Sequence, residues 1–329
     1  MAYYLGYDIG GTKCAVSLAS AVSGGIDILG KIKFPTAGLT PDEVMEKFAD
    51  GSREIAASHG IELSAVKRIG ISCGSPLDSK KGIIQSPPNL PGWDDVHITE
   101  YFESRLGIET RLQNDANACA VAEWQWGAGL KEDGSRVTDM VFVTFGTGFG
   151  AGLILDGRLY SGATDSAGEI GHVRLTRGDE DPVGYRKRGS VEGWCSGGGI
   201  AQQGVYAVRE ALSKGEVPIL WERAVKDEKN VTAKLIGDMA DEGDEFCIGI
   251  YRNVGIKFGE TCSILIDLFN PELIVAGGIF MRSAHLVLPY AEEVIKREAL
   301  PFAAEGCRIV PAGLGEKIGD YAALGIAAM

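Results

Sequence analysis

Two glycine-rich turns, each placed between apolar strand-like runs, constrain the fold of this chain more than any other feature. The first turn is Asp8-Ile-Gly-Gly-Thr-Lys13, and the second is Gly146-Thr-Gly-Phe-Gly150. Because glycine has no Cβ, such turns allow backbone N–H groups to approach a ligand such as a phosphate group. Two similar hairpins about 135 residues apart predict a duplicated architecture with one ligand held between the halves.

Composition excludes several classes of protein. A chain of 329 residues is expected to form about two domains, and its net charge of −13 argues against a nucleic-acid-binding surface. The seven cysteines are scattered without CxxC spacing, which favours reduced thiols and a cytoplasmic location over disulfides. No apolar run is long enough to span a membrane, and the N-terminus does not resemble a signal peptide.

The rest of the chain alternates between strand and helix signals, which predicts a mixed α/β fold. A capping sequence at Thr40–Glu43 predicts a helix that runs to about residue 60. Residues 176–190 are charged and predicted to be irregular. The other predicted elements are strands at 66–72, 110–112, 273–276 and 308–311, and helices at 98–106, 116–126, 283–298, 317–328 and over much of 199–265.

The first glycine turn supplies candidate ligands for a nucleotide phosphate. Asp8 could also hold Mg²⁺ through water, because this ion prefers few carboxylates and several waters. An ordinary glycine hairpin is the alternative explanation of this turn. Two glycines after the predicted strand 273–276 would let a flat base lie against the backbone. The residues predicted to bind the nucleotide are Asp8, Gly10, Gly11, Thr12, Lys13, Gly146, Thr147, Gly148, Gly277 and Gly278.

Asp115 is predicted to lie where a strand ends and a helix begins, the usual place for reactive groups in α/β proteins. It could accept the proton of a hydroxyl that attacks a γ-phosphate, but on local grounds the cap of the following helix is the more frequent role of such an aspartate. Glu169 and His172, flanked by glycines, could bind neighbouring sugar hydroxyls. A phosphate-binding turn followed closely by such a cluster indicates a kinase.

Six motifs occur in the order typical of one family. They are DIGGTK at 8–13, PNLPGW at 88–93, NDANA at 114–118, GTGFGAG at 146–152, AGEIGH at 167–172 and AGGI at 276–279. Together they resemble the ROK family (repressors, open reading frames and sugar kinases) of the actin-like sugar-kinase superfamily, and the resemblance covers essentially the whole chain.

The resemblance implies two actin-like, ribonuclease H-like α/β domains with duplicated topology around an interdomain cleft. We expect a small domain of residues 1–118 plus about 312–329 and a large domain of 119–311. The resemblance also implies ATP with Mg²⁺, a homodimer, and Asp115 as the catalytic base. The residues that match the family's sugar contacts are Asn89, Asn114, Asp115, Glu169, His172 and Glu192.

One departure from the family pattern concerns zinc. Many members carry a CxCGxxGC motif ten residues after the Gly-His dipeptide, where this chain has Val183-Gly-Tyr-Arg-Lys-Arg-Gly-Ser190. One histidine cannot form a structural zinc site, which needs four ligands. We therefore predict no zinc site, with this loop held by packing of Tyr185 and Trp194 and by hydrogen bonds.

The resulting hypothesis is an ATP-dependent, glucokinase-like sugar kinase that transfers a phosphoryl group to a hexose hydroxyl, with O6 of glucose as the leading acceptor. Kinases for fructose, mannose, allose, N-acetylglucosamine or N-acetylmannosamine remain alternatives within the class. A different class is a sugar-sensing protein without catalysis. A repressor is disfavoured because no helix-turn-helix domain is expected before the strand that precedes Asp8. The sugar itself, and whether polyphosphate replaces ATP, are left open.

Overall fold

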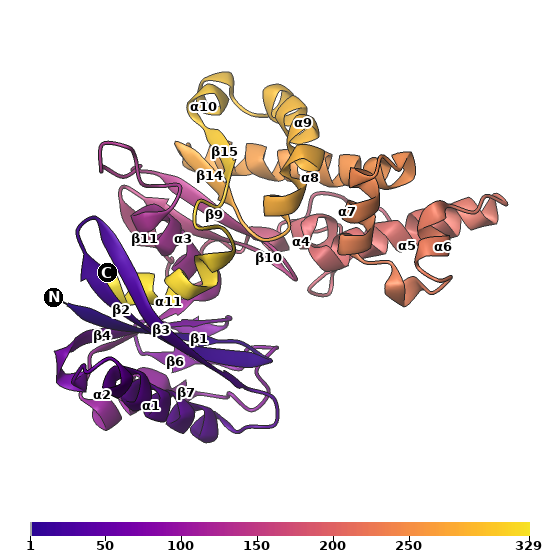
Figure 1. The fold of residues 1–329 in the computed structure, drawn as a ribbon. Coiled ribbons are helices and arrows are strands. Elements are labelled where there is room, and N and C mark those ends of the chain that lie inside the picture. The colour runs from indigo at the N-terminus through magenta and orange to yellow at the C-terminus, as the bar shows by residue number, and fades with distance from the viewer. Residues whose placement is uncertain (1) are drawn as a thin grey trace. The chain divides into compact units, whose positions relative to one another are not determined.

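The computed structural model describes residues 2–329, which divide into two compact units (Figure 1). The first unit comprises residues up to Val137, Gly152–Ala167 and Gly313–Met329, and the second comprises Thr138–Ala151 and Gly168–Ala312. The second unit therefore begins at Thr138, where the sequence suggested residue 119, because the helix Asp115–Trp126 belongs entirely to the first unit. Among residues 2–329, no helix combines the length and apolar character needed to cross a membrane.

The elements follow one another along the chain in a mixed α/β order. Those of the first unit are β1 (Tyr3–Ile9), β2 (Lys13–Val22), β3 (Gly25–Pro35), α1 (Pro41–Ser58), β4 (Val66–Cys73), β5 (Leu77–Asp78), β6 (Ile83–Ile84), β7 (Val96–His97), α2 (Ile98–Leu106), β8 (Thr110–Asn114), α3 (Asp115–Trp126), β11 (Arg158–Tyr160) and α11 (Ile318–Ala328). Those that begin in the second are β9 (Met140–Phe145), β10 (Phe149–Leu155), β12 (Val183–Gly184), β13 (Lys187–Arg188), α4 (Val191–Cys195), α5 (Gly197–Ser213), α6 (Ile219–Arg223), α7 (Ala233–Asp241), α8 (Glu245–Phe269), β14 (Leu273–Ala276), α9 (Phe280–Glu298), α10 (Pro301–Gly306) and β15 (Arg308–Pro311).

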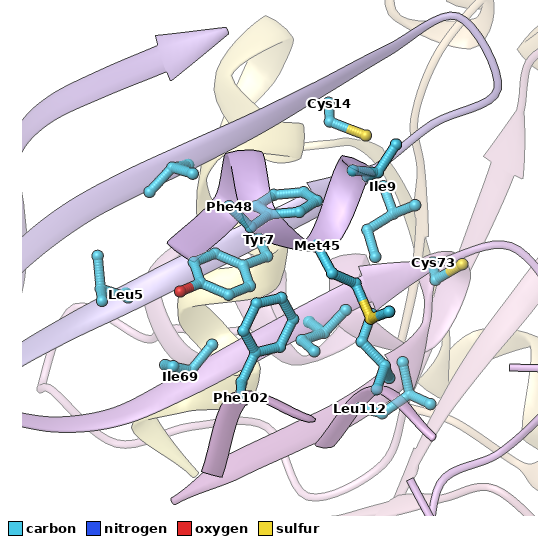
Figure 2. Close-up of a cluster of buried hydrophobic side chains, with 14 of the residues drawn as sticks. Leu5, Tyr7, Ile9, Cys14, Met45, Phe48, Ile69, Cys73, Phe102 and Leu112 are labelled. Carbon is cyan, nitrogen blue, oxygen red and sulfur yellow. The ribbon is translucent and has the colours of Figure 1, made fainter. Parts of the chain in front are cut away.

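β1 is the middle strand of the first sheet, whose order is β3-β2-β1-β4-β8. It pairs antiparallel with β2 and parallel with β4, which in turn pairs parallel with β8. Because side chains alternate along a strand, Leu5, Tyr7 and Ile9 point to one face and form a core with α1 and α2. In this core the ring centroid of Tyr7 lies 4.6 Å from that of Phe48 and 4.9 Å from that of Phe102 (Figure 2).

The opposite face of this sheet is covered by α11 (Figure 1). A Cβ atom at Gly6 would lie 2.9 Å from the side chain of Leu324, and one at Gly70 would lie 2.1 Å from the carbonyl oxygen of Ala323. The lack of side chains at these two glycines lets α11 pack directly on β1 and β4. Asp8 points to this same face because it follows Gly6 by two residues.

The second sheet has the order β11-β10-β9-β14-β15, and β14 pairs parallel with both β9 and β15. Four phenylalanines pack together where β9 ends, with ring centroids 5.3–6.4 Å apart: Phe145, Phe149, Phe258 and Phe280. Phe145 precedes the turn Gly146–Gly148 and Phe149 follows it. This aromatic cluster therefore fixes both ends of the second glycine turn.

The two sheets share one arrangement. In each, three strands that are consecutive in sequence lie side by side, and two later strands extend the sheet beyond the first of the three. The glycine turns lie at the same place in both, between the first and second strands. The predicted α/β class with duplicated topology is confirmed.

Local signals predicted several elements closely. Thr40 caps α1 by accepting a hydrogen bond from the backbone N–H of Glu43, while the Glu43 carboxylate accepts one from the backbone N–H of Thr40 at 2.7 Å. α2 and β15 have the predicted bounds. Residues 176–190 are less irregular than expected, because they contain the β12–β13 hairpin. Tyr185 and Arg186 form its turn with φ of +39° and +64°, typical of a two-residue hairpin turn.

Candidate active site

The carboxyl ends of β1, β4 and β8 bring separate sequence motifs together in the first unit. Because the three strands are parallel, the residues that follow them lie at one edge of the sheet. The Asn114 side-chain amide donates a hydrogen bond to Ser75 Oγ at 2.6 Å, which links the end of β8 to the segment after β4. Ser75 was not among the residues predicted from the sequence, since a serine beside a proline usually indicates only a turn.

Asn114, and not Asp115, is the N-cap of α3. Its side-chain oxygen accepts hydrogen bonds from the backbone N–H groups of Ala116 at 2.9 Å and Asn117 at 3.3 Å. The structural role considered for Asp115 from the sequence, the helix cap, is therefore wrong. Asp115 is the first residue of the helix, and its side chain is exposed at the sheet edge.

The environment of the Asp115 carboxylate affects its proton affinity. The surrounding protein displaces much of its hydration, and this desolvation raises its pKa above the ordinary aspartate value. A hydrogen bond of 2.8 Å from the backbone N–H of Ala116 acts in the opposite direction. A carboxylate whose pKa is raised is a better proton acceptor than an aspartate with the ordinary pKa.

The proline-rich loop places Asn89 at the same edge. A Cβ at Gly74 would lie 3.3 Å from the Asn89 side-chain oxygen, and a Cβ at Gly11 would lie 2.4 Å from the Asn89 carbonyl oxygen. Asn89 is therefore next to both the first glycine turn and the end of β4. The loop is anchored by buried Trp93, whose carbonyl oxygen accepts a hydrogen bond of 2.8 Å from the backbone N–H of Ser86.

Asp8 lies on the face of the first sheet that α11 covers, close to two other charged residues. Lys31 of β3 forms an ion pair with Asp320 of α11, and the sequence did not indicate this pair because 289 residues separate its members. Burial raises the pKa of Asp8 to about 6; Lys31 lowers it, while Asp115 and Asp320 raise it. The Asp115 carboxylate is thus close enough to Asp8 to raise its pKa.

The first glycine turn closes on itself. The Gly10 N–H donates to the Lys13 carbonyl at 3.2 Å, and the Gly10 carbonyl accepts from Thr36 Oγ1 at 2.7 Å. Gly10 therefore shapes the turn, while Thr12 and Lys13 at its tip are exposed.

The second glycine turn meets two other glycine segments in the second unit. A Cβ at Gly278, where φ is +65°, would lie 2.2 Å from the carbonyl oxygen of Phe145. The Gly146 carbonyl accepts a hydrogen bond of 2.8 Å from the backbone N–H of Gly197, the first residue of α5. The sequence showed the run Gly197–Gly199 but gave it no role. Here it lies against the turn that carries exposed Thr147.

The Glu169–His172 segment packs beside this same turn. Glu192 Oε2 accepts a hydrogen bond of 3.1 Å from the backbone N–H of Phe149 and would lie 2.9 Å from a Cβ at Gly148. A Cβ at Gly171 would lie 1.9 Å from the Phe149 carbonyl oxygen and 3.5 Å from the Glu192 side chain. The structure therefore brings the segment around Gly171, Glu192 and the second glycine turn together.

The segment that replaces the family's zinc motif is held by hydrogen bonds and ring contacts. The Trp194 indole N–H donates to Thr176 Oγ1 at 2.8 Å, and the Tyr185 ring centroid lies 4.9 Å from that of His172. Tyr185 is nevertheless 58% exposed, so its packing is one-sided. Within residues 2–329 no cluster of three or more histidine, cysteine or acidic side chains could hold a metal ion. The absence of a zinc site stays a prediction.

Comparison with known proteins gives the relatives of this chain. A sequence model of the ROK family matches residues 4–329. A protein named glucokinase from Halalkalibacterium halodurans is 29% identical over 322 residues, which cover 96% of this chain and 92% of the relative. Among solved structures, a ROK family glucokinase from Streptomyces griseus in complex with glucose and AMPPNP has a TM-score of 0.73 at 26% identity and covers 99% of both chains.

A ROK family transcriptional regulator, a homologue of the Escherichia coli MLC protein, has a TM-score of 0.82 at 22% identity. The match covers 99% of this chain and 77% of the regulator, and it shows a shared fold. These structures confirm the actin-like α/β class predicted from the sequence. Because the family model spans nearly all of the sequence, this chain belongs to the ROK family.

Proposed function

We propose that this chain transfers the γ-phosphoryl group of ATP to a hexose hydroxyl, with O6 of glucose as the leading acceptor. An ATP-dependent sugar kinase is the activity class supported by the glucokinase relative, which aligns with most of the chain. The observation that carries the proposal is the capping of α3 by Asn114, which leaves Asp115 exposed at the sheet edge beside Asp8.

In this proposal Asp115 is the general base. It accepts the proton of the sugar hydroxyl while the hydroxyl oxygen attacks the γ-phosphorus and the bond to the ADP oxygen breaks. The desolvation that raises its pKa favours this proton transfer. Asn89, Asn114, Glu169, His172 and Glu192 contact the sugar, because carboxylates accept hydrogen bonds from hydroxyls, whereas amides and an imidazole can both donate to hydroxyls and accept from them. Asn114 can do so with the second N–H of its amide, since the first donates to Ser75.

The nucleotide contacts are the two glycine turns with Gly277 and Gly278. Asp8 would hold Mg²⁺ through water, because this ion retains most of its hydration and needs few direct carboxylate ligands. When bound, the ion would neutralise charge on the phosphate oxygens. A homodimer and a cytoplasmic location belong to the same proposal. A dimer would have twice the chain mass of 34.9 kDa, which light scattering after gel filtration measures.

The alternatives are a kinase for another hexose or N-acetylhexosamine and a sugar-sensing protein without catalysis. The fold shared with a ROK transcriptional regulator favours keeping the second alternative. ADP release distinguishes a kinase from a sugar-sensing protein, because only a kinase releases ADP in a sugar-dependent manner.

The deciding experiment measures ADP release from Mg-ATP with a panel of hexoses and N-acetylhexosamines for the wild type, Asp115→Asn and a control, Asp179→Asn. Asp179 is an exposed aspartate outside the candidate site. We expect activity with glucose, a kcat at least about a hundredfold lower for Asp115→Asn, and no change for the control. Glucose binding by calorimetry and the melting temperature should stay close to wild type in both variants.

Two outcomes would contradict the proposal. If Asp115→Asn kept its turnover, Asp115 would not be the base. If folded wild-type protein bound a sugar but released no ADP with any member of the panel, the sensing alternative would replace the kinase.

A further inference from the structure

The first unit contains a pocket of about 430 Å³ that belongs to no part of the candidate active site. It is lined by residues of β1, of β2 and β3 on either side of their turn, of the end of α3 and the segment that follows it, and of the end of α11. Tyr4, at the start of β1, lies on its wall, whereas Asp8 lies at the other end of this strand, about 13 Å away along the chain. Asp115 likewise lies at the start of α3 and Trp124 near its end.

The pocket combines aromatic surfaces with a single positive charge. Tyr4, Trp124 and Trp126 supply the rings, and among the lining residues that the structure describes Arg136 alone carries a formal charge at pH 7. The guanidinium carbon of Arg136 lies 5.6 Å from the centroid of the Trp124 ring, and one of its N–H groups donates to the carbonyl oxygen of Gln125 at 3.3 Å. These contacts orient the guanidinium and use one of its five donors.

We propose that this pocket binds a small organic anion that carries a ring, such as an aromatic phosphate or a sugar phosphate. Indole and phenol rings pack against the face of a flat ring or against the C–H groups of a sugar, and a guanidinium pairs with phosphate through two parallel hydrogen bonds. Among the described lining residues a cationic ligand would find no carboxylate. A bare inorganic anion would leave the aromatic walls in contact with water.

An occupant of this pocket would also contact the segment through which the chain leaves the first unit. The Trp124 indole N–H donates to the carbonyl oxygen of Val137 at 2.8 Å, and the second unit begins at the next residue. Arg136 immediately precedes Val137. The pocket therefore adjoins one of the chain connections between the units.

The test is calorimetric titration of the full chain with phenyl phosphate, glucose 6-phosphate, inorganic phosphate and phenol. The two ring phosphates distinguish an aromatic ligand from a sugar ligand. We expect one of them to bind at least tenfold more tightly than inorganic phosphate or phenol. Arg136→Gln and Trp126→Leu should each weaken this binding at least tenfold, and Arg177→Gln, an exposed arginine that does not line the pocket, should leave it unchanged.

Melting temperatures show that the variants are folded. Arg136→Gln is the variant least expected to impair folding, because the side chain that it changes is exposed. Failure of both ring phosphates to bind the wild type would overturn the proposal. So would binding of equal strength in wild type and Arg136→Gln, which would place the ligand elsewhere, for example in the active site.

Discussion

Asn114 and Asp115 are neighbours with different roles, because which of them caps α3 decides which side chain is available for chemistry. Both residue types are frequent helix caps, so the sequence could place a cap at this junction but could not say which residue supplies it. The structure gives the cap to Asn114, and Asp115 is then available for chemistry. Lys31 and Asp320 were not predicted at all, because a pair 289 residues apart leaves no local signal.

At the residue scale, the pKa of Asp8 leads to a prediction about stability and pH. Burial raises this pKa to about 6 from the ordinary 3.8, so the folded state binds the Asp8 proton more tightly than the unfolded chain does. The contribution of Asp8 to stability is therefore complete below pH 3.8 and is lost as the pH rises through 6. An asparagine at this position does not ionise, so Asp8→Asn keeps at high pH the stability that the wild type loses. We expect the variant to melt on the order of a few degrees above wild type at pH 7.5.

The measurement is thermal unfolding of the unliganded protein between pH 4.5 and 7.5. The advantage of Asp8→Asn should shrink as the pH falls, and ADP release at pH 7.5 should be lost in the same variant. An advantage that is constant across this range would show that Asp8 titrates normally.

At the scale of elements, the strand–glycine turn–strand motif was predictable because glycine and apolar alternation are local signals. The Thr40 capping box was predictable for the same reason. The partners of these elements were not. Nothing in DIGGTK indicates that Gly11 lies against Asn89, or that the run Gly197–Gly199 lies against the second turn, because these approaches depend on how the strands pair.

Gly11→Ala tests the link between the first turn and the proline-rich loop. A Cβ 2.4 Å from the Asn89 carbonyl oxygen must displace one of the two segments. We expect the KM values for both ATP and sugar to rise at least about tenfold, since the turn and Asn89 shift together. Gly25→Ala is the matched control, because its Cβ would meet only an atom 4.0 Å away. A change in the KM for ATP alone would mean that the turn moves without the loop.

At the scale of the whole molecule, the family motifs and their order predicted the duplicated α/β fold, and the shared strand order of the two sheets confirms it. The path of the chain between the units was less predictable. The family resemblance implied that the last residues return to the first unit but not that residues 152–167 do, and tertiary contacts join both segments to that unit. The buried Glu123 carboxylate is one such contact, since it accepts hydrogen bonds of 2.9 Å from the backbone N–H groups of Gly313 and Leu314.

Removal of the last segment should therefore abolish the first unit. A chain that ends at Ala312 lacks α11, exposes the face of β1 and β4 around Gly6 and Gly70, and leaves Glu123 with fewer partners. We expect this chain to lose the near-ultraviolet circular dichroism of the first unit and to be cut rapidly by protease within residues 2–137. A chain that lacks only Met329 is the control. A truncated chain with wild-type protease resistance would refute the requirement.

The position of α11 also has a consequence for synthesis. The ribosome makes β1 and β4 long before α11, the helix that covers their second face. Most of the second unit is one continuous stretch, Gly168–Ala312, and is complete before that helix leaves the exit tunnel. β1 and β4 therefore wait, with one face of their sheet uncovered, until α11 has been made.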